Sequence, residues 1–250
     1  KNAFTNHENW DLAWKDPTPK KEYDVVIIGG GGHGLATAYY LAKEHNITNV
    51  AIIEKGWIGG GNVGRNTTII RSNYMHDENA LFSEFGMNLW RKMSQDLNYN
   101  VMFSPRGIIN LAHSDAQMNA YARRGNSMRL NGIDAVLLNR EQVKEIIPMA
   151  DFSDNVRFPI FGGLMQPSAG TARHDAVAWG YARQADSMGV DIIQNCEVTG
   201  FDLSAGKIKG IRTSRGDIKV KKVGLCVAGS TNILAEKLNM TLPIETHLLQ

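Results

Sequence analysis

The fold is decided by the stretch Tyr23-Asp24-Val25-Val26-Ile27-Ile28-Gly29-Gly30-Gly31-Gly32-His33-Gly34. A short apolar run ends in glycines with GxGxxG spacing, Gly29, Gly31 and Gly34. A second apolar run, 50–53, ends in Glu54, 20 residues past Gly34. In such a fingerprint the glycines permit a tight turn, close approach to a pyrophosphate and close helix–strand packing. The acid accepts hydrogen bonds from a ribose. The sequence therefore predicts a dinucleotide-binding unit.

Composition narrows the function classes. The 250 residues are 43% hydrophobic and 21% charged, enough for one large or two small domains. The net charge of +2 gives no electrostatic reason to expect nucleic-acid binding. Two cysteines, Cys196 and Cys226, are too few for a disulfide framework or a zinc site. No apolar run approaches the roughly 18 residues of a membrane span. We therefore expect no metal, no membrane contact and a cytoplasmic location.

The two ends of the chain differ from its interior. Residues 1–21 are polar, carry Trp10 and Trp14, and contain no apolar core of a signal peptide. They are expected to form an arm that docks on a partner or on its own domain. The chain stops at 247–250 in a segment that resembles a strand. We expect this to be the front part of a longer protein.

Apolar periodicity and turn residues predict the elements between. A helix over 32–45 begins inside the glycine turn and directs its positive end at a phosphate. The stretch 57–68 is too rich in glycine for a helix or plain strand. It is either a ligand-binding loop or a flexible linker, and its position after Glu54 favours the ligand loop. Further elements are a helix over 79–97 with an apolar stripe, a strand over 106–111, a helix ending at 131 that opens with a Ser114–Gln117 capping box, and a short helix capped by Asn139.

The last third of the chain returns to the nucleotide-binding pattern. A helix over 174–188 precedes a parallel strand at 191–194, an antiparallel meander (197–202, 208–213 and 217–220), a separate apolar strand at 223–228 and a short helix opened by Ser230. Such a meander favours FAD over NAD as the cofactor.

The predicted fold is α/β: a doubly wound, FAD-binding parallel sheet with a β-meander, of the glutathione-reductase type, plus an inserted α+β substrate layer. The expected division is an arm at 1–21, a βαβ unit at 22–72, the inserted layer at 73–169 and the FAD-binding continuation at 170–250.

Three stretches resemble the β subunits of heterotetrameric sarcosine oxidases, which are FAD-dependent amine oxidoreductases. They are IGGGGHGLATAYYL (28–41), GNVGRNTTIIRSNY (61–74) and Arg173-His174-Asp175. The similarity extends from about Glu22 to Gln250, and the family's subunit continues well past that point. The resemblance implies an enzyme that demethylates sarcosine oxidatively to glycine. Non-covalent FAD takes the electrons, covalent FMN passes them to O2 to give H2O2, and the one-carbon unit leaves as formaldehyde or 5,10-methylenetetrahydrofolate. It also implies α, γ and δ subunits as partners, with NAD and tetrahydrofolate on the α subunit.

The resemblance also assigns roles to single residues. Besides the three fingerprint glycines, Gly32 and His33 would lend backbone amides to the pyrophosphate, and Glu54 would bind the ribose. The loop residues that would line FAD, or else only pack the loop, are Asn62, Arg65, Thr67 and Ile70. Val198 would contact the adenine through its backbone, although its type suits an ordinary core position.

Two further residues would carry the chemistry. Arg71 would hold the substrate carboxylate bidentately, unless it forms a structural salt bridge. His174 would bond to the 8α carbon of FMN, with Arg173 beside it, whereas a lone histidine at a helix start is usually a surface or capping residue. The alternatives are another FAD-dependent secondary-amine dehydrogenase, of dimethylglycine or opine type, and a non-catalytic nucleotide-binding scaffold subunit.

Overall fold

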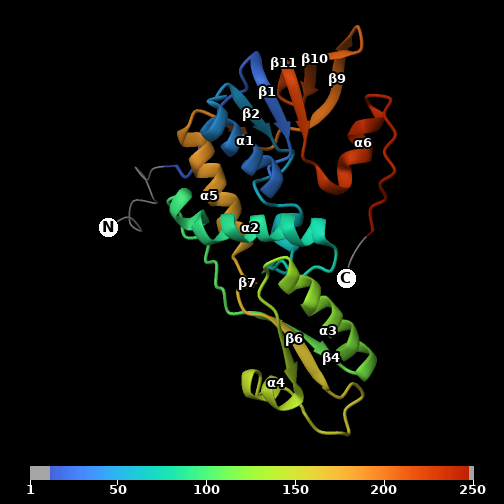
Figure 1. Cartoon of the computed structure of the whole chain (residues 1–250). Coiled ribbons are helices and arrows are strands. Elements are labelled where there is room, and N and C mark those ends of the chain that lie inside the picture. The colour runs from blue at the N-terminus through green and yellow to red at the C-terminus, as the bar shows by residue number, and fades with distance from the viewer. Residues whose placement is uncertain (1–11, 248–250) are drawn as a thin grey trace. The chain divides into compact units, whose positions relative to one another are not determined.

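The computed structural model describes residues 12–247 of the chain. They belong to two compact units (Figure 1). The first unit comprises Lys1–Asn66 and His174–Gln250, and the second comprises Thr67–Arg173.

The first unit is built on one sheet. Within the described residues its six strands lie in the order β8-β2-β1-β11-β10-β9. β1 is parallel to β2 and β11, β2 is parallel to β8, and β10 runs antiparallel between β9 and β11. The strands are β1 (Glu22–Ile28), β2 (Val50–Ile53), β8 (Asp191–Ile193), β9 (Val198–Ser204), β10 (Lys207–Thr213) and β11 (Gly216–Leu225). The predicted α/β fold, a parallel sheet extended by a meander, is confirmed.

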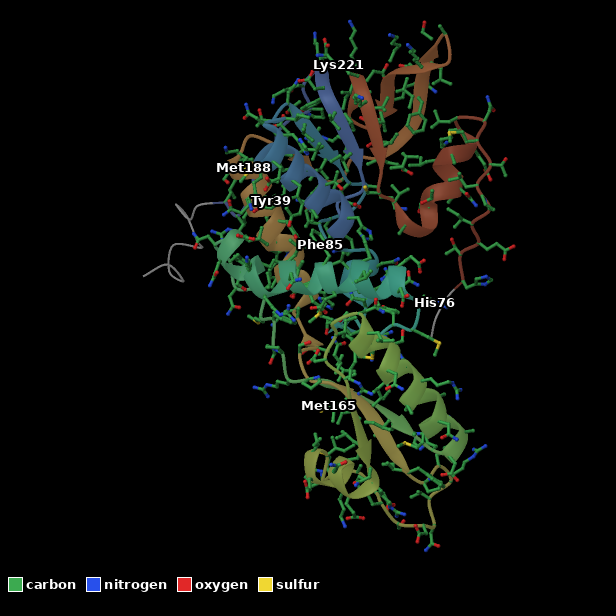
Figure 2. The ribbon with its side chains drawn as sticks, viewed as in Figure 1. Tyr39, His76, Phe85, Met165, Met188 and Lys221 are labelled. Carbon is green, nitrogen blue, oxygen red and sulfur yellow. The ribbon has the colours of Figure 1, made fainter. Side chains whose placement is uncertain are left out.

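Helices cover this sheet because its central strands are apolar on both faces. α1 (Gly32–His45) and α5 (His174–Ser187) lie side by side in Figure 1. Tyr39 of α1, labelled in Figure 2, meets the ring of Tyr181 of α5 edge-on with centroids 5.4 Å apart. Ile27 of β1 faces α1, whereas its neighbour Ile28 belongs to a separate cluster with Phe201 of β9. That cluster also contains Leu234 of α6 (Thr231–Glu236), which follows η3 (Ala228–Ser230).

One expectation for the meander is wrong. Its third strand and the apolar strand expected at 223–228 form a single strand, β11. β11 pairs with β10 from Gly216 to Lys219 and with β1 from Lys219 to Leu225. The two residues between the expected strands are Lys221 and Lys222. Neither is a glycine or a proline, which would end the strand pairing. Lys221 instead forms an ion pair with Asp24 of β1.

The described part of the N-terminal arm, residues 12–21, contacts its own unit. The Lys15 amide donates to the Asp186 carboxylate at 3.0 Å, and Asp16 accepts from the Gln194 amide at 3.1 Å. Arg215 adds an ion pair with Asp16 at 3.3 Å. Residues 12–21 therefore dock on their own domain, which was one of the two expected alternatives. Trp10 and the rest of 1–11 lie outside the described residues.

The second unit holds two small antiparallel sheets. One has the order β4-β6-β5 and the other pairs β3 with β7. Leu164 of β6 is fully buried in a cluster with Met128 of α3 and Ala80 of α2. The bounds are β3 (Ile69–Ile70), α2 (Asp77–Asp96), β4 (Ile108–Ala112), α3 (Asp115–Leu130), β5 (Val136–Asn139), α4 (Arg140–Ile146), β6 (Gly162–Gln166) and β7 (Gly170–Thr171).

The predicted caps of this unit are largely confirmed. Asn139 forms a complete capping box with Gln142 at the start of α4. Ser114 accepts from the Gln117 amide as expected, but the Gln117 side chain accepts from the amide of His113 rather than that of Ser114. Gly132 ends α3 with φ of +75°, a conformation that glycine adopts without strain.

The apolar stripe expected on the helix over 79–97 marks the buried face only near the C-terminal end, where Met93 and Leu97 are buried. The buried residues of α2 are Ala80, Met87 and Met93. Phe82 and Phe85, the latter labelled in Figure 2, are 80% and 64% exposed. Aromatic residues at helical spacing were therefore a poor guide to which face of α2 is covered.

Candidate functional site

The glycine turn brings three backbone segments together. Gly29 has φ of +110°, and a Cβ there would lie 2.3 Å from the carbonyl oxygen of Cys226. A Cβ on Gly34 would lie 2.0 Å from the carbonyl oxygen of Gly29. These distances are far below van der Waals contact, so only glycine fits at both positions. The first and third glycines of the fingerprint therefore hold β1, α1 and the end of β11 at backbone contact.

The N-terminus of α1 emerges from this turn. Its N-cap, Gly31, is extended and offers no side-chain cap to the first turn of the helix. The amides of Gly32, His33 and Gly34 therefore have no intrahelical acceptor and carry the positive end of the helix dipole. The His33 side chain is exposed. These donors fit a pyrophosphate.

Glu54, at the end of β2, has a structural role that the sequence did not reveal. One of its oxygens accepts from the Gly30 amide at 2.7 Å, and the other accepts from the Gly56 amide at 2.8 Å. The carboxylate thus joins the glycine turn to the start of the next loop. Each oxygen keeps a lone pair that can accept from a ribose hydroxyl.

The loop after Glu54 folds back over the glycine turn. The Gly59 amide donates to the Gly30 carbonyl at 3.1 Å, and Val63 lies 3.4 Å from where a Cβ on Gly32 would stand. Asn62 and Arg65 are the two ends of a 3-10 turn, η2 (Asn62–Arg65). These contacts hold the part of the loop from Gly59 to Val63 against the glycine turn.

His174 is the first residue of α5. Its side chain is 30% exposed, and its Nδ1 accepts from the Asp175 amide at 2.7 Å. Next to it is a cavity of about 370 Å³, whose lining includes Trp57, Arg65, Asp175 and Trp179. A Cβ on Gly60 would lie 2.7 Å from the Trp57 ring, so this glycine lets the indole lie across the loop. The cavity has flat apolar walls and one charge of each sign.

Val198 begins β9 and pairs with Thr213 of β10. Its side chain is buried in the core cluster that contains Phe201 and Ile211. Only its backbone is therefore suited to contact a ligand.

The remaining predicted residues belong to the Thr67–Arg173 unit. Thr67 precedes Thr68, which has φ of +59°, and Ile70 pairs with Gly170 between β3 and β7. The Arg173 amide donates to the Val101 carbonyl at 3.0 Å.

Arg71 lies in a polar cluster that the sequence did not predict as a whole. Its guanidinium donates to the Asn73 side chain and lies over the Tyr74 ring at 4.7 Å. Asn73 is fully buried, and its carbonyl accepts from Arg124 of α3. Burial, together with the charge of Arg71, lowers the pKa of Arg124. Within residues 12–247 no carboxylate forms an ion pair with Arg71, so the salt-bridge alternative lacks a partner there.

A second set of buried polar groups fixes the backbone beside Arg71. The Ser72 amide donates to the Gln166 side chain at 3.0 Å, and Gln166 donates back to the Ser72 hydroxyl at 2.7 Å. The same hydroxyl donates to Glu84 at 2.7 Å. Because such networks are costly to leave unsatisfied, this strand end is held in one conformation.

No group of three or more His, Cys, Asp or Glu side chains is placed to hold a metal ion in residues 12–247. Nor is any helix among them long and apolar enough to cross a membrane.

Comparison with known proteins agrees with this geometry. The sarcosine oxidase subunit beta of Rhizobium meliloti (strain 1021) is 60% identical over 249 residues, which cover 100% of this chain and 60% of the relative. The subunit of that name from an Arthrobacter species is 53% identical, over 97% of this chain and 60% of the relative. The chain thus spans about 60% of the length of these relatives.

Solved structures show the same fold. L-proline dehydrogenase from P. horikoshii superposes with a TM-score of 0.83 at 26% identity, over 90% of this chain and 58% of that one. Glycine oxidase from Bacillus cereus ATCC 14579 gives a TM-score of 0.75 at 22% identity, over 86% of this chain and 57% of that one. The model of the FAD dependent oxidoreductase family matches residues 24–250. The chain therefore belongs to the FAD dependent oxidoreductase family.

Proposed function

We propose that this chain is the FAD-binding, substrate-oxidising subunit of a sarcosine oxidase. The observation that carries the proposal is the glycine turn: its unpaired α1 amides and the Glu54 carboxylate beside them match the pyrophosphate and ribose of FAD. The high identity to two proteins named sarcosine oxidase subunit beta supports the choice of amine. Bound FAD would supply the two-electron oxidation of sarcosine, with covalent FMN passing the electrons to O2 to give H2O2.

Arg71 has the chemistry to hold the substrate. Its guanidinium keeps donors beyond the one used on Asn73, and a planar guanidinium binds a carboxylate bidentately. The Ser72–Gln166 network fixes the adjoining backbone, which limits the positions that the carboxylate can take. In the proposal the Arg71 guanidinium anchors the carboxylate of sarcosine. The oxidised product then loses its one-carbon unit as formaldehyde or to tetrahydrofolate, leaving glycine.

His174 is proposed to carry FMN through Nε2. Nδ1 already accepts the Asp175 amide, so Nε2 is the nitrogen left for a bond to carbon. In this tautomer Nε2 holds the ring proton. A bond from Nε2 to the 8α carbon would release this proton and one proton of the methyl group, and the electron pair of the broken C–H bond would reduce the FMN ring, which O2 would then reoxidise. The cavity beside Asp175, walled by Trp57 and Trp179, suits a flat aromatic ring, and Arg173 precedes the histidine. The proposal also includes α, γ and δ partner subunits, with NAD and tetrahydrofolate on the α subunit, and a cytoplasmic location.

Anaerobic reduction tests the proposed activity. Sarcosine added to the assembled enzyme without oxygen should bleach the flavin absorbance. Arg71→Ala should raise the sarcosine concentration that gives half of the full bleaching by about tenfold or more, because a charged hydrogen-bond pair is lost. Arg157→Ala, an exposed arginine of the same unit, is the matched control. Absence of bleaching in the wild type would refute the proposal and leave a non-catalytic scaffold. Bleaching by dimethylglycine but not sarcosine would move the proposal to another amine.

A further inference from the structure

Arg71 and Arg124 meet at one buried residue. Arg71 donates from Nη1 to the Oδ1 of Asn73, while Arg124 donates from Nε to the main-chain carbonyl of Asn73 at 2.6 Å and also from Nη2. The amide of Asn73 cannot turn over, because its Nδ2 donates to the Oδ1 of Asn110 at 2.7 Å. One side chain and one carbonyl thus fix the positions of two guanidinium groups.

The two cations lack a compensating acid. Neither forms an ion pair with any carboxylate in residues 12–247, and Arg124 is half-buried. The lowered pKa of Arg124 agrees with burial and a neighbouring like charge. Two adjacent, partly desolvated cations repel each other, and an anion between them would remove that cost. Arg124 uses two N–H groups on Asn73, which leaves three of its five donors.

The packing of α3 keeps Arg124 in place. Gly125, the next residue, is buried, and a Cβ there would lie 3.1 Å from Leu164 of β6. Tyr121, one turn earlier, donates to the Leu111 carbonyl at 3.2 Å. The helix therefore lies close against the sheet on the side that carries Arg124.

We propose that Arg124 is a positioning residue that determines specificity for an anionic substrate. It holds the Asn73 carbonyl and thereby the orientation of Arg71, and it adds a second positive charge that favours a carboxylate over a neutral group. The identity of the substrate as sarcosine rests on the proposed function, but the preference for a carboxylate does not.

The test compares sarcosine with its neutral amide and uses acetate as a carboxylate without the amine. In the assembled enzyme we would measure the KM and kcat of sarcosine, the inhibition constant of its neutral amide, N-methylglycinamide, and the Kd of acetate from the flavin spectrum. The variants are Arg124→Gln, Arg124→Lys and, as control, Arg123→Gln, which removes an exposed charge one residue away on the same helix.

The expected result is a split between acid and amide. Arg124→Gln should raise the KM of sarcosine and the Kd of acetate about tenfold, equivalent to ~1.4 kcal/mol. The amide constant and kcat should stay within about twofold of the wild type, since a charged partner is lost and a neutral one is not. Arg124→Lys should recover part of the acetate affinity because it keeps the charge, and Arg123→Gln should match the wild type.

Two results would overturn the inference. One is equal weakening of acid and amide in both Arg124 variants, which would indicate a purely structural role. The other is unchanged acetate affinity in Arg124→Gln. If sarcosine fails to reduce the wild-type flavin, the proposed function fails, while the acetate affinities still decide the role of Arg124.

Discussion

Tyr23 shows how one hydroxyl joins two strands that are far apart in the chain. The side chain is fully buried in β1, and its hydroxyl donates to Asp191 of β8 at 2.8 Å. The hydroxyl also accepts from the Lys20 amide at 3.0 Å, and Lys20 pairs with Asp191 at 2.7 Å. Burial, above all, raises the pKa of Tyr23, and the neighbouring Asp191 raises it further.

Tyr23→Phe is predicted to lower the free energy of unfolding by about 2 kcal/mol at neutral pH, because it removes two hydrogen bonds with a usual net value of about 1 kcal/mol each. The pH dependence should change as well. Because the pKa is raised in the folded state, the neutral tyrosine stabilises the fold fully below pH about 10, and this stability is lost as pH rises further. Urea unfolding at pH 7 and above pH 10 measures both effects.

The phenylalanine variant should therefore lose less stability in alkali than the wild type. Tyr40→Phe is the control, since no hydrogen bond of its hydroxyl occurs within residues 12–247. An equal alkaline loss in wild type and Tyr23→Phe would show that Tyr23 is not the titrating group.

At this scale the sequence predicted what local spacing encodes. Gly29 and Gly34 follow from a pattern of six residues, and the structure leaves no room for a side chain at either. Arg124 could not be predicted, because its partner Asn73 is 51 residues away and no periodicity links the two. The two hydrogen bonds of Glu54 were missed for a related reason: they depend on how the loop returns over the turn.

Among the elements, the loop after β2 is predicted to depend on Glu54. In Glu54→Gln one oxygen is replaced by an NH2 group, which would face the amide of Gly30 or Gly56 donor to donor. We expect FAD to dissociate about tenfold more readily, equivalent to ~1.4 kcal/mol, from loss of one charged hydrogen bond. Fluorescence of released FAD on dilution measures this.

Glu44→Gln, which removes an exposed acid at the end of α1, is the matched control. FAD affinity unchanged by Glu54→Gln, or lowered equally by Glu44→Gln, would contradict the role given to Glu54.

Element types were predictable where periodicity was long, and less so where packing decided. The helix over 32–45 and the strand over 50–53 have the predicted bounds. β11 was expected as two strands because two lysines separate its apolar parts, yet Lys221 is accommodated in the strand by an exposed side chain that pairs with Asp24. The covered face of α2 was predicted correctly at Met93 but not at Phe82 and Phe85, since Ala80 and Met87 are buried at that end of the helix instead.

At the scale of the whole molecule, we propose that one chain binds two flavins. In the proposal, the glycine turn and Glu54 would hold FAD without a covalent bond, and His174 at the start of α5 would bind FMN through Nε2. A family match over residues 24–250 supports the first assignment. The second is supported by an Nε2 that has no hydrogen bond within residues 12–247 and lies beside a cavity with two tryptophans. The two assignments predict different behaviour when the protein is denatured.

The most direct test is acid precipitation of the intact enzyme, followed by the mass of this chain and analysis of the released flavin. We expect FAD in the supernatant and a chain heavier by one FMN. In His174→Asn the added mass should be absent, while FAD should still be released. A chain of unmodified mass, or an added mass that persists in His174→Asn, would contradict the proposal.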